Sequence, residues 1–108
     1  MSKHHTFTPG PWNIGRIPTT VISPNTVETT RKYTGSPDGG VNDVEHYGGS
    51  LIAESVLRRE NAHLIAAAPN MYDVLVNLLA VEEDHELECV IEEAKKAIAK
   101  ANGWGLLL

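Results

Sequence analysis

The 108-residue sequence has little cysteine, little positive charge and no long apolar run. Cys89 is the single cysteine, so an intramolecular disulfide is excluded and a disulfide-stapled secreted scaffold is not expected. The longest nearly apolar run, residues 64–68, is far too short to cross a bilayer. No apolar stretch follows the first five residues, so no signal peptide is predicted and the cytoplasm is the expected compartment.

The charge balance also limits the possible partners. The formal net charge is -5, which argues against a protein that binds the phosphate backbone of nucleic acids. A small anion could still bind a local basic pocket, because net charge says little about one site. The hydrophobic fraction of 42% is ordinary for a globular protein, and the length suits a single domain over residues 1–108.

Residue sets for catalysis and metal binding are missing as well. The spacings of the five histidines match no known ligand pattern, so no metal is predicted. Cys89 lies among carboxylates, which do not favour a thiolate, and it is predicted to be a buried or half-buried structural residue. No nucleophile with a paired base is evident. We therefore expect a protein that has no cofactor and is not an enzyme.

The composition changes near Val56, and this change predicts an α+β fold. Residues 7–56 hold most of the prolines and glycines, with frequent Thr, Val and Ile, which is typical of strands and turns. Three or four antiparallel strands are predicted there, with a mobile loop near residues 35–49. The predicted strands are residues 12–17, 19–23, 26–33 and 51–56.

Residues 58–102 are rich in Ala, Leu, Glu and Lys with apolar positions at helical spacing, which predicts a helical hairpin that packs against the sheet. Pro69 interrupts the first periodic stretch and predicts either two abutting helices, 59–68 and 69–81, or one kinked helix. The second helix is expected from Asp84, as N-cap, to residue 102, with Gly103 just past its end. The apolar tail, residues 103–108, is expected to dock on this chain or on a partner.

The most suggestive group of polar residues lies at the predicted junction of sheet and helix. Two arginines, an asparagine and a histidine would meet at a helix N-terminus, where free N–H groups favour an anion. A further arginine and two aromatic side chains from the strands could add charge and a stacking surface. The alternative interpretation is a solvated basic turn. The predicted ligand-binding residues are Arg58, Arg59, Asn61, His63, Trp12, Tyr33 and Arg16.

Two motifs resemble those of a family of small phage and prophage proteins. Thr8-Pro9-Gly10-Pro11-Trp12 is similar to its N-terminal TPGPW element, and residues 61–69, Asn-Ala-His-Leu-Ile-Ala-Ala-Ala-Pro, are similar to its NA-x-LIAAAP element. Both are intact and in the expected order, ahead of an amphipathic helix. The resemblance implies a phage accessory protein in the cytoplasm of an infected bacterial host, and it brings no catalytic residues.

Three functions follow as hypotheses. The first is a counter-defence protein that sequesters a small anionic ligand, a cyclic or linear nucleotide, at the predicted residues. The second is an inhibitor that binds a host or defence protein through its acidic helix or its loop, without a small-molecule ligand. The third, a nucleic-acid-binding regulator, is disfavoured by the charge. A homodimer or higher homo-oligomer is expected, because the apolar tail and the small residues 66–69 both favour a covered surface.

Overall fold

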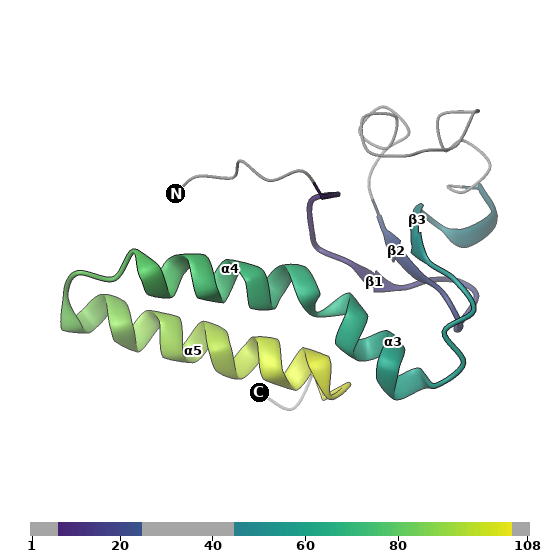
Figure 1. Cartoon of the computed structure of the whole chain (residues 1–108). Coiled ribbons are helices and arrows are strands. Elements are labelled where there is room, and N and C mark those ends of the chain that lie inside the picture. Colours follow the sequence, from purple (N-terminus) through teal and green to yellow (C-terminus); the bar gives the residue numbers. More distant parts are fainter. Residues whose placement is uncertain (1–6, 25–44, 105–108) are drawn as a thin grey trace.

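The computed structural model describes residues 7–24 and 45–104. Short strands come first and helices follow, which confirms the predicted α+β class (Figure 1). The elements are β1 (Asn13–Ile14), β2 (Val21–Ser23), β3 (Ser50–Ala53), α3 (Arg59–Ala66), α4 (Ala68–Leu79) and α5 (Asp84–Ala101).

The three strands form one antiparallel sheet in the order β1-β2-β3, so β2 is central. Ile14 pairs with Val21, and Ile22 pairs with Leu51, with a register shift between Val21 and Ile22 that leaves Ile52 of β3 as the extra residue. All three residues of β2 are buried, and Val21 has no exposed surface at all. The β-branched pair at the centre of this small sheet is therefore part of the core.

The strands are shorter than predicted, for local reasons. Residues 12–17 were expected as one strand, but the chain turns at Gly15, whose N–H donates to the Thr20 carbonyl at 2.9 Å. A side chain at Gly15 would collide with the Thr20 hydroxyl, so this turn requires glycine. Residues 51–56 were expected as another strand, but it ends at Ala53, and Ser55 then takes a positive φ of 59°. Such a conformation is incompatible with a continuing strand.

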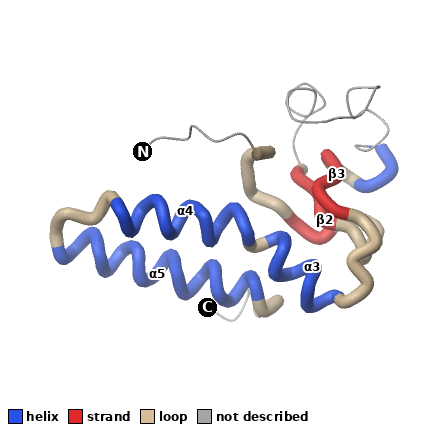
Figure 2. The backbone as a smooth tube through the Cα atoms, viewed as in Figure 1, coloured by secondary structure: helices blue, strands red, loops and turns tan. Residues whose placement is uncertain are grey.

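Three predicted features lie mostly or wholly outside the described residues: the strand at 26–33, the loop at 35–49 and the apolar tail at 103–108. Of that loop, Glu45–Tyr47 form a short helical turn next to β3 (Figure 2). Gly49 then approaches β2 so closely that a Cβ there would lie 2.5 Å from the Ser23 carbonyl oxygen. The close approach of this backbone to the central strand therefore excludes a side chain.

The sequence allowed either two abutting helices or one kinked helix around Pro69, and the structure has two abutting helices. α3 ends at Ala66, Ala67 joins the two, and Pro69 lies in the first turn of α4, where its missing N–H has no intrahelical partner to lose. α5 begins at Asp84, but Glu83 is the N-cap, with extended backbone and no side-chain cap, so the predicted cap at Asp84 is wrong by one residue.

The end of α5 follows the predicted pattern. Gly103 has a φ of 77°, and its N–H donates to the Lys100 carbonyl at 3.0 Å. The Trp104 N–H donates to the Ala99 carbonyl at 2.7 Å. This pair of bonds is a Schellman motif, which satisfies two carbonyls that the helix itself leaves free. The prediction of Gly103 just past the helix end is confirmed.

The sheet packs against the helices through α3. Val21, Ala62 and Ala66 form the buried cluster, and partly buried side chains such as Trp12 and Ile65 surround it. α4 and α5 pack against each other and extend away from the sheet as a hairpin (Figure 1). The protein is flat, with principal extents of 47 × 29 × 17 Å. Within the described ranges, no helix has both the length and the hydropathy to span a membrane.

The N-terminal segment packs on the start of α4. Gly10 lies against Pro69 so tightly that a Cβ at position 10 would be 2.7 Å from the proline Cβ. The Phe7 ring meets the Tyr72 ring edge-on at 5.0 Å and the Trp12 ring at 6.4 Å. The two motifs that carry the family resemblance, far apart in sequence, are therefore in direct contact.

Candidate functional site

The start of α3 is an exposed basic corner. Arg58 is the N-cap and Arg59 the first helical residue, and no side chain caps the helix. Arg58 Nη2 lies 3.5 Å from Glu60 Oε2, with both side chains more than 70% exposed. Asn61 is also exposed. An ion pair with this exposure contributes little stability, so the arginines remain accessible to an anion.

His63 lies in a different environment, under the end of α5. A Cβ on Gly103 would be 3.0 Å from His63 Cδ2, so the imidazole packs directly on this glycine. The histidine is half-buried by that contact. His63 therefore helps to join α3 to the end of α5. The sequence pattern had predicted instead that it would lie beside the arginines in a ligand site.

Trp12 and Arg16 have structural contacts of their own. The Trp12 indole N–H donates to the Thr8 carbonyl at 3.1 Å, and the ring packs against the Val21 cluster. The Arg16 guanidinium donates to the Glu45 carbonyl at 2.9 Å, which ties the β1–β2 turn to the residues before β3.

The seven predicted residues thus lie in several separate surroundings. Tyr33 is outside the described residues. Among the other six, no side-chain hydrogen bond or ion pair in the described ranges links one to another. The predicted set therefore divides into an exposed pair of arginines with Asn61 and three residues that hold the fold together.

An open hollow of about 290 Å³ lies between α4 and α5, away from these residues. Lys100 Nζ donates to Asn70 Oδ1 at 2.9 Å, and Asn77 Nδ2 donates to both carboxylate oxygens of Glu93 at 3.3 and 3.1 Å. Burial lowers the pKa of Lys100 from its ordinary value of 10.5. The lining residues are Asn70, Asp73, Val74, Glu93 and Lys96.

Sequence reasoning missed this polar edge, although a signal was present. Asn70 and Asn77 are seven residues apart on α4, and Glu93 and Lys100 are seven apart on α5, so each pair shares one helix face. The hollow is at the small end of the range for ligand pockets. Two of its polar lining residues, Asn70 and Glu93, already bond to side chains of the opposite helix, and these bonds help to hold the two helices in register.

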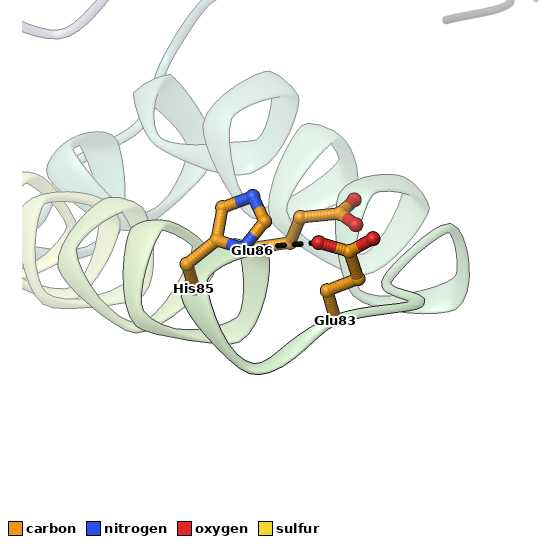
Figure 3. A group of neighbouring side chains, drawn as sticks. All are labelled: Glu83, His85 and Glu86. Atoms are coloured by element: carbon orange, nitrogen blue, oxygen red, sulfur yellow. Dashed lines mark ion pairs between the residues drawn. The ribbon is translucent and has the colours of Figure 1, made fainter.

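A histidine and two carboxylates gather at the start of α5 (Figure 3). Glu83, His85 and Glu86 each offer one ligand atom, and these atoms lie within 4.8 Å of one another. His85 Nδ1 is 3.2 Å from Glu83 Oε2, with both side chains about 70% exposed. An exposed ion pair of this kind forms without a metal, so the geometry by itself assigns no metal site. The sequence expectation of no metal stays a prediction.

The same region is the most acidic surface of the described chain. No lysine or arginine occurs from residue 60 to residue 94. Four carboxylates crowd the turn into α5, at the end of the hairpin away from the sheet (Figure 1), and three of them are exposed. We call these four residues the acidic tip: Glu82, Glu83, Asp84 and Glu86.

Cys89 is exposed on α5, so its predicted role as a buried or half-buried structural residue is wrong. The next residue, Val90, is the one that faces the core, because neighbouring positions on a helix point about 100° apart. Neighbouring Glu88 is exposed as well. The thiol therefore faces solvent on an acidic stretch of α5.

The comparison with known families identifies the origin of the chain. A family model described as Salmonella phage P22 protein Y8K6 matches residues 1–105. The chain belongs to this family. No curated protein and no solved structure matches it. This membership confirms the resemblance to a family of small phage proteins, and it assigns no activity to the chain.

Proposed function

We propose that this member of the phage P22 Y8K6 family is an accessory protein that binds a host protein in the infected bacterial cell, without catalysis. The acidic tip is the observation that supports this proposal. It projects at the end of the hairpin, beyond the sheet and α3, where it can contact another molecule (Figure 1). The partner that fits is a protein with a basic surface.

Repulsion among the carboxylates of the acidic tip favours a partner of opposite charge. Like charges that crowd on one helix turn repel each other, and the helix dipole offsets only part of that repulsion. No lysine or arginine within residues 60–94 neutralises the tip. A basic partner surface would remove the repulsion, and its attraction acts over a distance and speeds association. Such binding weakens as salt is added.

The test compares two variants with the same charge change. The tip variant is Glu82→Gln/Glu83→Gln/Glu86→Gln, and the control, Glu45→Gln/Glu54→Gln/Glu60→Gln, removes three exposed carboxylates near the sheet and the start of α3. Proteins retained from infected cells would be identified with the wild type and then purified. We expect direct binding at low salt that is lost in the tip variant and kept in the control. Equal binding by both variants, or none by the wild type, would refute the proposal.

A second candidate, sequestration of a nucleotide, is favoured by the basic corner of α3. The uncapped helix start leaves N–H groups available to an anion, and Arg58 and Arg59 add two exposed guanidinium groups. The test is thermal unfolding against a panel of cyclic and linear nucleotides, with Arg58→Ala/Arg59→Ala and the matched control Lys95→Ala/Lys96→Ala.

A ligand that binds only the folded state raises the melting temperature as its concentration passes the dissociation constant. We expect a shift that the α5 control keeps and the α3 variant loses. If no nucleotide in the panel shifts the melting temperature at saturating concentration, this candidate fails for that panel, and the protein-binding proposal is unaffected.

A further inference from the structure

The hairpin carries apolar side chains that nothing in the described chain covers. They are well separated from the sheet and lie on both helices. Their exposed fractions range from 40% to 60%, which is high for leucine and isoleucine in a folded domain. We call these residues the hairpin face: Leu75 and Leu78 of α4, and Leu87, Ile91 and Ile98 of α5.

These five residues share one side of the hairpin. The bonds Asn77–Glu93 and Asn70–Lys100 cross between the helices on one edge and define its polar side. With about 100° of rotation per residue, the residues of the hairpin face lie about 80° to 180° round each helix from those polar positions. Because the two helices are joined on the polar side, their apolar residues meet on the opposite side.

The apolar surface of α5 is too wide for one neighbouring helix. Val90 and Ala97 are buried and face α4. The apolar positions of the hairpin face on residues 87–98, with Ala94 between them, follow a spacing of four, three and four residues. That spacing is typical of a helix that packs against neighbours in a bundle or coiled coil. α5 therefore has one apolar seam for α4 and a second seam with no partner in the described chain.

We propose that a second copy of the chain covers the hairpin face, so that two hairpins form a four-helix bundle. The size of the face agrees with this occupant. α5 is about 27 Å long and two packed helices are about 18–20 Å wide, so the face projects onto roughly 500 Å². Accessible area exceeds projected area, and a stable dimer buries about 800 Å² per partner. A two-fold axis would cover both apolar surfaces at once.

The charges on α5 select the arrangement of the two copies. Its first half holds only acidic charges, Glu88 among them, and its lysines begin at Lys95. A two-fold axis that crosses the helices sets α5 antiparallel to its equivalent, with acidic half against basic half. An axis parallel to the helices would place the two acidic tips side by side. Opposite charges attract and like charges repel, so the antiparallel bundle is favoured.

The antiparallel arrangement also gives matched layers. With the axis level with residues 92 and 93, Leu87 lies opposite the partner's Ile98, and Ile91 lies opposite the partner's Ala94. Glu88 and the partner's Lys95 then flank the apolar seam within reach of each other, twice by symmetry. In the single chain Lys95 Nζ is 3.5 Å from Glu92 at an exposed position, a weak pair that the new contact can replace.

The first experiment is sedimentation of the full chain between about 1 and 100 μM protomer, over which a dimer of this size class should form. Ile91→Glu and Leu75→Glu place charges in the hairpin face and should weaken association at least ~100-fold. Leu57→Glu is the matched control, since Leu57 is 87% exposed before α3 and off the face. Circular dichroism shows whether each variant keeps its helices.

The second experiment reverses the charges. Glu88→Lys and Lys95→Glu should each weaken the dimer, and the double variant should restore it. A wild type that stays monomeric throughout, or a dimer that Ile91→Glu leaves intact, would overturn the inference. A dimer that the double reversal does not restore overturns the antiparallel arrangement. The tip variant of the proposed function leaves Glu88 and Lys95 unchanged, so the two proposals can fail separately.

Discussion

Gly10→Ala tests the contact between residues 8–12 and residues 61–69, the two segments on which the resemblance was based. The added Cβ would lie 2.7 Å from Pro69 Cβ and 3.3 Å from Pro69 Cγ. Carbon atoms in contact prefer about 3.5–4.0 Å, so the N-terminal segment has to move by roughly 1 Å relative to α4. Overpacking of this kind costs about 1–3 kcal/mol. The loss of backbone freedom in the unfolded chain offsets about 0.4–1 kcal/mol of that.

The midpoints of these two ranges leave an expected net loss of about 1.3 kcal/mol in the free energy of unfolding. For a domain of this length, each kcal/mol lowers the melting temperature by about 4–8 °C. The assay is urea unfolding, monitored by the helical circular dichroism signal. It compares the wild type with Gly10→Ala, Pro69→Gly and the double variant. Pro69→Gly removes both ring carbons that the new methyl would meet. The cost of Gly10→Ala should then fall by at least about 0.5 kcal/mol in that background.

Two results would refute this reasoning. One is a Gly10→Ala protein within about 0.5 kcal/mol of the wild type, which is the range of ordinary surface substitutions. The other is an equal loss in both backgrounds. Either result would mean that Gly10 and Pro69 are not in the tight contact described above, and that the first motif folds independently of the second.

Three further outcomes are expected. Gly103→Ala should lose about 1–2 kcal/mol of unfolding free energy, because an alanine at a φ of 77° is strained, and Gly103→Asn should lose less; urea unfolding measures both. Trp12→Phe removes the indole donor to Thr8 and should cost about 0.5–1.5 kcal/mol, with the helical signal of the folded state unchanged. Lys100→Met tests the lowered pKa of Lys100. Between that pKa and 10.5 the unfolded chain binds more protons than the folded one, so wild-type stability should rise with pH relative to the variant in urea unfolding.

Local patterns were sufficient to predict the helices. Apolar spacing, Pro69 and Gly103 gave their order and placed their ends within about two residues, because each signal acts within one or two turns, but they left open whether residues 59–81 form two helices or one kinked helix. The strand ends were harder, since a turn at Gly15 and a positive φ at Ser55 cut short sequences that otherwise alternate like strands. The predicted cap at Asp84 differs by one residue from the observed cap, Glu83, which is the usual scatter of helix ends.

The candidate site was much less predictable. The hypothesis grouped residues by chemical type, and side chains with suitable chemistry can serve the fold. His63 packs on Gly103, Trp12 on the core, and Arg16 on the Glu45 carbonyl. Only the exposed corner at Arg58 matches the predicted setting, and it lacks the other groups. Which side chains share a surface depends on long-range packing that spacing along the chain does not encode.

The sequence alone determined the α+β class, the helical half and the origin in a phage family, because periodicity, turn residues and motifs are local. Tertiary structure decided that the sheet rests on α3 while the α4–α5 hairpin projects from it (Figure 1). It also decided which apolar residues remain exposed. A helical pattern shows that a side of a helix is apolar, but only the packed fold shows whether that side is covered. On α5 the apolar surface is wider than the part that α4 buries.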